Sequence, residues 1–394
     1  MTPRPVALLT YSTKPRGGVV HTLALAEALQ ETGTSVQVVA LGDPAGGFFR
    51  PVRVPVTLVA GPQHATNLEE KVAGSIDALE AALQALVARQ PDVILHAQDC
   101  ISARAAARVR DAGSGVPVVR TVHHVDDFSS AVLMDCQRQA VLKPDVVLVV
   151  TEVWRQLLEA DYGVRSSVVP NGVDMAAYAG TSPRRAAELR AWVGARERPL
   201  LLSVGGIEPR KGTADLVRAL ALLRDRLPVP PVLAVLGGHS FQDYRAYRDA
   251  VLAELPGLGL ELGRDLFEVG TVPEADMAAW YAAADVLAFP SVKEGFGLAV
   301  LEAMSACLPV VTSDLPVFRE YLVPGRDALL VGVGDVPALA EALARALADD
   351  ALREQLVTAG QSLARRSTWA RSAAKHLSLY ATVPAVRPRV AAPV

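Results

Sequence analysis

The stretch Pro290-Ser-Val-Lys-Glu-Gly-Phe-Gly-Leu-Ala-Val-Leu-Glu-Ala-Met304 decides the fold. An apolar run, Val286–Pro290, precedes two closely spaced glycines, Gly295 and Gly297, and a pattern of helical period begins near Leu298. Short apolar runs that end at turn residues are typical of buried strands, and the longer period is typical of helices. The stretch therefore predicts a strand, a glycine turn and a helix, a unit of a parallel α/β sheet.

The glycine turn is also a predicted binding position. The first N–H groups of a helix have no partner within the helix, and its N-terminus carries partial positive charge. We therefore expect the N–H groups of Phe296, Gly297 and Leu298 to approach an anion or a sugar. Glu294 and Glu302 flank the turn and can hold hydroxyl groups, although a solvated loop residue and a helix-surface charge would also explain them.

The alternation of short Val/Leu runs with longer Ala/Leu/Arg stretches continues along almost the whole chain. It predicts βαβ units around parallel sheets. The predicted strands are Val6–Thr10, Val36–Leu41, Val93–His96, Val118–Val122, Val146–Val150, Ser167–Val169, Leu200–Val204, Val232–Leu236, Phe267–Gly270, Val286–Pro290, Val310–Ser313 and Ala328–Val331. The predicted helices are Val19–Thr32, Leu68–Arg89, Ile101–Ala112, Trp154–Asp161, Thr213–Arg226, Tyr244–Leu255, Glu274–Ala284, Leu298–Ala306 and Val336–Asp349.

The α/β pattern breaks near Pro170 and restarts at Leu200, which predicts two doubly wound, Rossmann-like domains at residues 1–175 and 176–366. A helix at 367–383 and a Pro/Ala/Val/Arg-rich tail at 384–394, which we expect to be disordered, follow them. Ligands of doubly wound sheets bind beyond the carboxyl ends of the strands. The loops after the strands are therefore where site residues are expected.

Bulk properties limit the function classes. The 394 residues carry a formal net charge of -3, which does not favour a nucleic-acid-binding protein. No apolar run approaches the roughly 20 residues of a membrane span, and the N-terminal run Val6–Thr10 is too short for a signal peptide. Cys100, Cys136 and Cys307 lack the spacing of a zinc site or a disulfide framework. We expect a cytoplasmic protein whose cysteines are reduced and packed as small core residues.

Cationic residues follow the first strand of the second domain, in Ser203-Val-Gly-Gly-Ile-Glu-Pro-Arg-Lys-Gly-Thr213. Arg210 and Lys211 precede a helix at the carboxyl edge of the sheet, where a bound phosphate group would need positive charge. An exposed pair of cations in a loop is the alternative interpretation.

Two loops of the first domain are also candidates. Gly17 and Gly18, in Lys14-Pro-Arg-Gly-Gly-Val19, follow the first strand and either let a phosphate approach or form a plain tight turn. The strand Val118–Val122 ends in His123-His-Val-Asp-Asp127, which places His123 at the carboxyl edge of the sheet. Asp126 and Asp127 either orient an acceptor hydroxyl or cap a helix.

Together these motifs resemble the retaining glycosyltransferases of family 4, which have the GT-B fold of two Rossmann-like domains facing each other across a cleft. The family's mark is two glutamates with seven residues between them, around Gly-Phe-Gly. The resemblance implies that Glu294 contacts the transferred sugar, that Glu302 contacts the donor ribose, and that Lys211 neutralises the diphosphate. The family arginine five residues before the lysine is Gly206 here, and Arg210 is the nearby guanidinium that could replace it.

The resemblance assigns further roles. It places Gly17 and Gly18 against the donor diphosphate, His123 beside the reacting sugar, and Val272, in Gly270-Thr-Val272, against the nucleotide base. It implies that the N-terminal domain takes the acceptor, that the C-terminal domain takes the donor, and that the last helix crosses back to the N-terminal domain.

We therefore expect a retaining hexosyltransferase that moves a sugar from a nucleotide diphosphate sugar to an unidentified small-molecule, glycan or lipid acceptor. The sequence has no Asp-x-Asp motif, so neither a metal nor another cofactor is expected. A nucleotide-sugar 2-epimerase and a non-catalytic nucleotide-sugar-binding protein of the same fold are the alternatives. The missing G-x-G-x-x-G fingerprint disfavours a dehydrogenase. The sequence leaves open the oligomeric state and a peripheral position at the inner membrane face.

Overall fold

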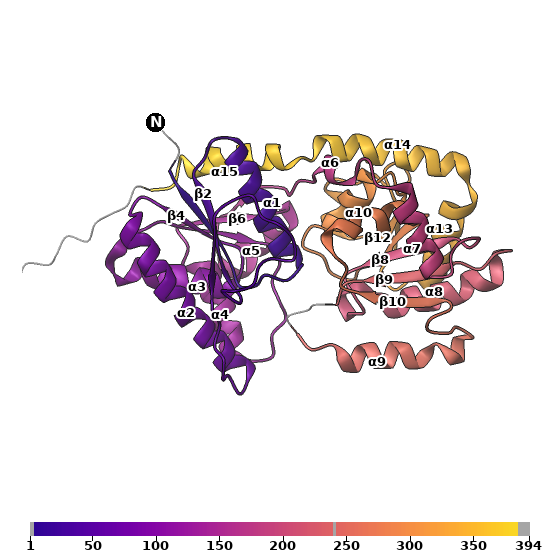
Figure 1. Cartoon of the computed structure of the whole chain (residues 1–394), viewed down its shortest axis with the longest axis horizontal. Helices are drawn as coiled ribbons and strands as arrows, with labels where there is room; N and C mark the ends of the chain where they lie inside the picture. Colours follow the sequence, from indigo (N-terminus) through magenta and orange to yellow (C-terminus); the bar gives the residue numbers. More distant parts are fainter. Residues whose placement is uncertain (1–3, 239–241, 385–394) are drawn as a thin grey trace, which may run out of the picture. The chain divides into compact units, whose positions relative to one another are not determined.

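The computed structural model describes residues 4–238 and 242–384. It confirms the predicted α/β class, because it contains two sheets in which every recorded strand pair is parallel. The chain forms two compact units, which Figure 1 shows: Met1–Asn171 with Trp369–Val394, and Gly172–Thr368. The split after Asn171 lies slightly before the boundary predicted after residue 175. The predicted tail, apart from Pro384, lies outside the described residues.

The sheet of the first unit has the strand order β3-β2-β1-β4-β5-β6-β7. Its strands are β1 (Val6–Thr10), β2 (Val36–Leu41), β3 (Val56–Val59), β4 (Ile94–Ala97), β5 (Val118–Val122), β6 (Val146–Val149) and β7 (Ser167–Val168). Its helices are α1 (Gly17–Glu31), α2 (Leu68–Arg89), α3 (Cys100–Val109), α4 (Ala131–Leu142), α5 (Glu152–Tyr162) and α15 (Trp369–Tyr380), and a π-helical turn at Arg110–Ser114 follows α3.

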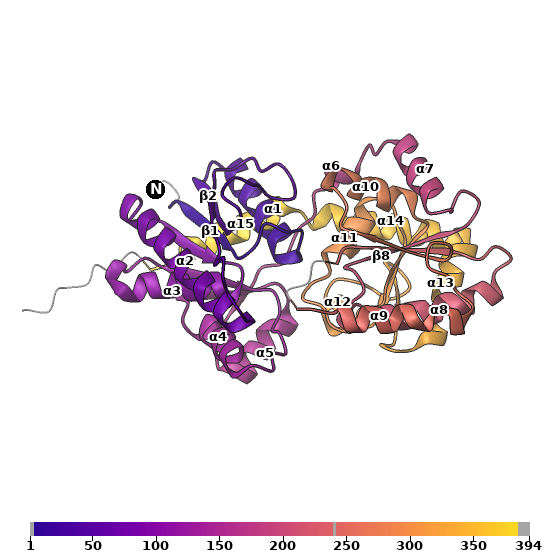
Figure 2. The ribbon, with the colours of Figure 1, turned by 60° about the horizontal axis from the view of Figure 1, so that its bottom comes forward.

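Helices cover both faces of this sheet, as Figure 2 shows. Leu23 and Leu29 of α1 and Tyr380 of α15 pack with Leu8 and Val38 of the central strands in one core cluster. Helices α2 to α5 lie on the opposite face (Figure 2). Because both faces are buried, the strands consist of continuous apolar runs, which is why their positions could be predicted.

Buried histidines join α15 to the first sheet. His96 of β4 shares hydrogen bonds with Tyr380 of α15 (2.6 Å) and with Thr121 of β5 (2.8 Å). His376 of α15 packs near His96, with ring centroids 5.6 Å apart, and the ring of His21 lies 6.2 Å from that of His376. The last helix is therefore an integral part of the first unit.

The sheet of the second unit has the order β10-β9-β8-β11-β12-β13. Its strands are β8 (Leu200–Val204), β9 (Val232–Leu236), β10 (Leu266–Gly270), β11 (Val286–Phe289), β12 (Val310–Ser313) and β13 (Leu329–Val331). Its helices are α6 (Met175–Tyr178), α7 (Pro183–Trp192), α8 (Thr213–Arg226), α9 (Arg245–Glu254), α10 (Glu274–Ala283), α11 (Leu298–Ser305), α12 (Pro316–Arg319), α13 (Val336–Ala348) and α14 (Asp350–Arg366), with short 3-10 turns at Pro209–Lys211 and Pro256–Leu258. Leucines of α8 and α13 pack on one face of the sheet, and α10 and α11 lie on the other (Figure 2).

Six elements were not predicted: β3, α4, α6, α7, α12 and α14. Strand β3 lies at the edge of the sheet with Val56 39% exposed, so it has no continuous apolar run. Helix α7 begins at Pro183 with Ser182 as its N-cap and buries only Ala186 and Leu189. Where so few side chains are buried, the apolar period that identifies a helix is missing.

The buried histidines of the first unit predict acid sensitivity. Burial lowers the pKa of His376 to about 4 and, with His376 nearby, that of His21 to about 3. An unfolded imidazole titrates near pH 6.5. The stability that these neutral rings contribute is therefore complete above that pH and is lost as the pH falls from 6.5 toward 4.

We expect the free energy of unfolding to fall by about 2 kcal/mol per buried histidine between pH 7 and pH 5. Urea titrations at the two pH values measure this loss. His376→Gln should show a smaller loss than the wild type, because glutamine does not titrate. His64→Gln, at an exposed position, is the control and should keep the full loss.

Candidate active site

The second sheet brings two of the predicted site loops together. Strands β8 and β11 are parallel neighbours at its centre, and the chain proceeds from β8 toward one edge and from β11 toward the other. The loops after β8 and β11 therefore diverge at a topological switch point, where open α/β sheets bind ligands. Lys211 follows β8 and Glu294 follows β11.

Lys211 and Glu294 form a buried ion pair at this point. The Lys211 Nζ lies 2.6 Å from Glu294 Oε1, and each side chain is 8% exposed. The Ser291 hydroxyl donates to the same oxygen at 2.9 Å, and Lys211 Nζ lies 4.4 Å from the centre of the Phe289 ring. Burial alone would raise the pKa of Glu294, but Lys211 and Arg210 hold it below its usual value. The carboxylate is therefore ionised at neutral pH.

Arg210 is a more exposed cation beside the same carboxylate. Its Nε donates to Glu208 Oε2 at 3.0 Å, and its Nη1 lies 3.7 Å from Glu294 Oε1. The Arg210 side chain is 47% exposed, whereas that of Glu208 is 5% exposed. The Arg210 carbonyl accepts a hydrogen bond from the Val292 N–H at 2.8 Å. The backbone and the charged side chains thus both join the loop after β8 to the loop after β11.

The backbone explains why residue 206 is not an arginine. Gly206 has φ +78°, a conformation that side-chain-bearing residues rarely adopt, and an added Cβ would lie 2.7 Å from the Gly238 Cα. An arginine at this position would require the loop to move. The difference from the family pattern at Gly206 is therefore part of the local fold.

The glycine turn before α11 is equally constrained. Gly297 has φ +86°, and an added Cβ would lie 2.4 Å from a ring carbon of Phe318. The buried Phe296 ring stacks on Tyr321 at 5.1 Å, and the Tyr321 hydroxyl donates to the Phe296 carbonyl at 2.8 Å. Leu298 begins α11, with Gly297 as an N-cap that has no side chain to cap the helix. Packing therefore fixes the predicted N–H donors at the start of this helix.

Glu302 lies within α11 against two tyrosines. The Tyr281 hydroxyl donates to Glu302 Oε2 at 2.7 Å, and the Tyr178 ring lies 5.6 Å from that of Tyr281. Burial, reinforced by the charge of Glu274, raises the pKa of Glu302 to about 7. Near neutral pH this carboxyl is therefore about half protonated, which a charge on an open helix surface would not be.

Val272 lies apart from this group. It is half-buried in the turn between β10 and α10. Because β9 separates β10 from β8, Val272 follows an edge strand and not one of the two central strands. The sheet therefore places Val272 two strands away from the strand that precedes Lys211.

The first sheet has its own switch point, between β1 and β4. Helix α1 begins at Gly17, directly after the loop that follows β1. A Cβ added to Gly18 would lie 3.6 Å from His123 Cδ2, so the structure brings Gly18 and His123 together. The His123 Nε2 shares a hydrogen bond with Gln98 Oε1 at 3.0 Å, and Gln98 follows β4.

The His123 ring is held by neighbours on several elements. The buried His21 ring of α1 lies against it edge to face, with centroids 4.6 Å apart. Burial, together with the neighbouring His21 ring and the Arg120 guanidinium, lowers the pKa of His123 well below its usual value, so the ring is neutral. The exposed His124 instead lies 3.4 Å from an Asp126 carboxylate oxygen.

The capping interpretation of Asp126 and Asp127 is wrong. Helix α4 begins at Ala131, and the Ser130 hydroxyl accepts a hydrogen bond from the Leu133 N–H as its N-cap. The alternative, that these aspartates orient an acceptor hydroxyl, stays a prediction.

Sequence reasoning missed the residues that hold the predicted ones. These are Gln98 on His123, Tyr281 and Tyr178 near Glu302, Ser291 on Glu294, and Tyr321 under Phe296. Only Ser291 lies within a motif that the sequence singled out. The others are distant along the chain from the residues they touch, so spacing gave no signal for them.

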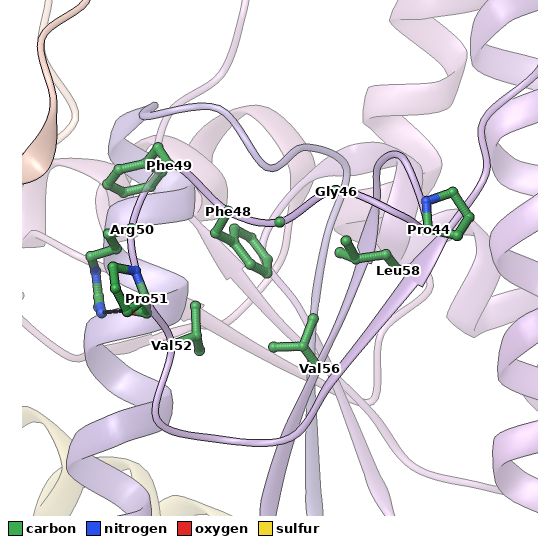
Figure 3. Close-up of a pocket in the computed structure, with 10 residues that line it drawn as sticks. Pro44, Gly46, Phe48, Phe49, Arg50, Pro51, Val52, Val56 and Leu58 are labelled. Carbon is green, nitrogen blue, oxygen red and sulfur yellow. Dashed lines mark hydrogen bonds between the residues drawn. The ribbon is translucent and has the colours of Figure 1, made fainter.

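Within residues 4–238 and 242–384, no group of three or more His, Cys, Asp or Glu side chains is arranged to hold a metal. In the same ranges, no helix combines the length and apolarity needed to cross a bilayer. A cavity of about 610 Å³ lies between β3 and the loop that joins β2 to β3, and Figure 3 shows its lining, which includes Phe48, Arg50 and Val56. None of the predicted site residues lines it.

Comparisons with known proteins identify the family of this chain. The model of the family Glycosyl transferases group 1 matches residues 186–363, and that of Glycosyltransferase Family 4 matches residues 15–177. The chain is 30% identical to a D-inositol 3-phosphate glycosyltransferase of Jonesia denitrificans, over 99% of this chain and 97% of that protein. It is also 30% identical to a phosphatidyl-myo-inositol mannosyltransferase of Mycolicibacterium smegmatis, over 95% and 92%.

Solved structures show the same fold. The chain resembles HepE of Anabaena in complex with UDP and glucose, with a TM-score of 0.80 and 20% identity over 96% of this chain and 100% of that one. It also resembles a sucrose-phosphate synthase from Thermosynechococcus elongatus, with a TM-score of 0.81 and 22% identity over 96% and 98%. The fold is thus that of the GT-B glycosyltransferases. The chain belongs to glycosyltransferase family 4, and it is a glycosyltransferase.

Lys211 is buried and Arg210 is half-exposed, so removing each cation should lower turnover to a different extent. Lys211→Ala should lower turnover roughly a hundredfold or more, because it deletes the buried positive charge of the site. Arg210→Ala should have a milder effect, because its guanidinium is half-exposed and shared with Glu208. Initial rates of diphosphate release measure both.

Arg226→Ala is a matched control, since Arg226 makes an exposed ion pair with Glu341 and should leave turnover unchanged. A larger effect of Arg210→Ala than of Lys211→Ala would contradict the assignment of the buried lysine as the main charge partner.

Proposed function

We propose that this protein is a retaining, metal-independent glycosyltransferase that moves a sugar from a nucleotide diphosphate sugar to an acceptor hydroxyl. The observation that carries the proposal is the buried Lys211–Glu294 pair between the loops after β8 and β11. A cation and a carboxylate at one switch point match the two needs of this reaction, which are charge for a leaving diphosphate and acceptors for sugar hydroxyls.

Lys211 and Arg210 serve the leaving group in this proposal. As the bond to the anomeric carbon breaks, negative charge grows on the phosphate oxygen. Preorganised cations and helix N–H groups at that position lower the barrier without a bound metal ion. The start of α11 at Leu298 supplies the helix N–H groups, and Glu208 keeps the Arg210 guanidinium beside Lys211.

Retention of configuration is supported by the state of Glu294. A double displacement needs a carboxylate that is free to bond to the anomeric carbon. Glu294 is held by Lys211 and Ser291, which suits an acceptor of sugar hydroxyls better than a nucleophile. We therefore infer attack by the acceptor on the face that the diphosphate leaves, with a departing phosphate oxygen as the base.

The first unit supplies His123 to the proposed reaction. If the Gln98 Oε1 accepts the Nε2 proton, the Nδ1 of a neutral His123 is a hydrogen-bond acceptor for a hydroxyl group. Gly18 lies directly beside the ring, because a Cβ at this position would be in van der Waals contact with His123. These features support a role for His123 beside the reacting sugar.

The relatives suggest an acceptor class. One relative is named a D-inositol 3-phosphate glycosyltransferase and another a phosphatidyl-myo-inositol mannosyltransferase. We therefore propose an inositol phosphate, free or lipid-linked, as the first acceptor to test, with a uridine nucleotide among the donors because HepE binds UDP.

The purified protein should be incubated with a panel of nucleotide sugars, with and without D-inositol 3-phosphate or phosphatidylinositol, while diphosphate release is followed. We expect one combination of nucleotide sugar and acceptor to give a glycoside with retained anomeric configuration. The rate of this transfer should be the same with and without EDTA. Abolition by EDTA and recovery with magnesium would contradict metal independence. Release of diphosphate together with an epimerised free sugar, independent of any acceptor, would instead indicate the 2-epimerase.

The two glutamates have different proposed partners, the ribose for Glu302 and the sugar for Glu294. Their substitution should therefore affect donor binding and sugar transfer differently. Glu302→Gln should weaken binding of the nucleoside diphosphate about ten- to a hundredfold, the value of a charged hydrogen bond of roughly 1.5 to 3 kcal/mol to the ribose. Glu294→Gln should not weaken it, because the sugar is absent and Lys211 loses its competing carboxylate, but transfer should fall sharply. Calorimetry with the diphosphate and turnover of the intact donor measure the two effects.

The raised pKa of Glu302 adds a pH dependence. Ribose hydroxyls donate to the ionised carboxylate, so affinity should be highest above pH 7 and fall as the pH drops through about 7. The diphosphate itself titrates in the same way with both proteins. The difference in affinity between the wild type and Glu302→Gln, measured across this pH range, therefore reports the titration of the Glu302 carboxyl. Parallel pH profiles would rule out Glu302 as the ribose partner.

A further inference from the structure

His21 of α1 packs directly against the histidine of the candidate active site. Its ring meets that of His123 edge to face, with centroids 4.6 Å apart and planes inclined by 71°. His21 follows Gly18 by three residues in α1, so both lie on the same face of the helix, and Gly18 is also beside His123. One face of α1 thus forms a wall against the His123 ring, while Gln98, after β4, holds that ring by a hydrogen bond.

The orientation of His21 is itself fixed by residues where the chain leaves and re-enters the first unit. The His21 Nδ1 shares a hydrogen bond of 2.8 Å with the Asn171 Oδ1, and Asn171 is the last residue before the chain enters the second unit. Trp369 is the first residue after the chain returns, and its ring lies edge to face against His21, with centroids 5.2 Å apart. All of these groups belong to the first unit.

The hydrogen bond to Asn171 determines the tautomer of His21. An amide oxygen can only accept a hydrogen bond, so the proton of the neutral ring lies on Nδ1 and Nε2 is unprotonated. The ring is neutral at pH 7 because burial lowers the pKa of His21 to about 3. The Nε2 has no hydrogen-bond partner among the described residues. His21 is therefore held at one ring nitrogen and by the rings that pack on it.

A residue that only filled space at this position would not need to be a histidine. His21 is fully buried, and leaving a buried polar atom unpaired costs free energy that leucine or phenylalanine would avoid. A histidine adds one directional hydrogen bond, which gives its flat ring a single orientation. The ring touches His123, whose Nδ1 is directed to a hydroxyl group in the proposed function.

We propose that His21 is a positioning residue for the transfer reaction, in which Asn171 fixes the His21 ring and the His21 ring fixes that of His123. The proposal rests on the proposed function, in which His123 lies beside the reacting sugar. Positioning residues act through geometry, because displacement of a reacting group by about 1 Å can cost roughly a hundredfold in rate. The proposal also gives a role to Asn171, which lies at the break in the α/β pattern after Pro170.

The contacts are tested by histidine NMR, which does not depend on activity. In protein labelled with nitrogen-15 histidine, long-range proton–nitrogen spectra distinguish a protonated ring nitrogen from an unprotonated one, and single His→Gln variants assign the signals. We expect the wild-type His21 to be the Nδ1–H tautomer alone. Asn171→Ala should let His21 populate both tautomers and should also shift the His123 signals.

Val72→Ala is the matched control, because Val72 is buried in α2, which lies on the opposite face of the same sheet from α1 (Figure 2). It should lower the stability of the first unit and leave the His21 and His123 signals unchanged. The signals of the exposed His64 should not change in either variant. His123 signals that stay fixed while His21 loses its single tautomer would overturn the proposal, and so would a His21 tautomer that does not depend on Asn171.

The consequence for transfer is measured with Asn171→Ala and with His21→Phe, which keeps a ring but cannot donate to Asn171. We expect kcat to fall about tenfold or more in each variant. The affinity for the nucleoside diphosphate, measured by calorimetry, should not change, because Lys211 and Glu302 belong to the second unit. Val72→Ala should leave kcat unchanged.

A double substitution separates positioning from a merely structural role. In a His123→Ala protein, adding Asn171→Ala should not lower the residual rate of diphosphate release further, because there is no longer a His123 ring to position. An equal fold loss in both backgrounds would overturn the proposal. Absence of transfer by the wild type would instead contradict the proposed function, and the NMR experiment would still test the contacts.

Discussion

The buried contact between Lys211 and Glu294 is the interaction on which the second unit's site depends. Either charge alone, at 8% exposure, would be strongly destabilising. The pair is possible because the parallel order of β8 and β11 carries both loops to the same sheet edge. A Cβ added to Gly205, which has φ +125°, would lie 2.3 Å from the Lys211 Cε, so this glycine leaves the room that the buried lysine needs.

Much of the fold followed from the sequence because both sheets are buried on both faces, so strands such as β1 and β9 are continuous apolar runs. Elements with few buried residues, such as α7, left no such signal. For the site, the positions of Lys211, Glu294 and His123 at strand ends could be predicted from motifs. Their partners could not, because contacts such as that between Gln98 and His123 depend on strand order in three dimensions.

Glu294 and Glu302 of the second unit show how the environment changes the pKa of identical side chains. Glu294 is buried beside cations and stays ionised, whereas burial and the charge of Glu274 raise the pKa of Glu302 to about 7. Sequence spacing treats the two glutamates as equivalent members of one motif. Burial and neighbouring charge, and not the spacing of the motif, therefore decide the protonation state of each glutamate.

The return of α15 to the first unit makes the second unit an inserted domain. The chain enters it at Gly172 and leaves it at Thr368, and these crossings are adjacent, because the Val173 N–H donates to the Ser367 carbonyl at 2.8 Å. Residues 172–368 are therefore one continuous segment with neighbouring ends, whereas the first unit is discontinuous. A gene fragment can encode the second unit directly, but the first requires a short linker from Asn171 to Trp369 in place of the excised segment.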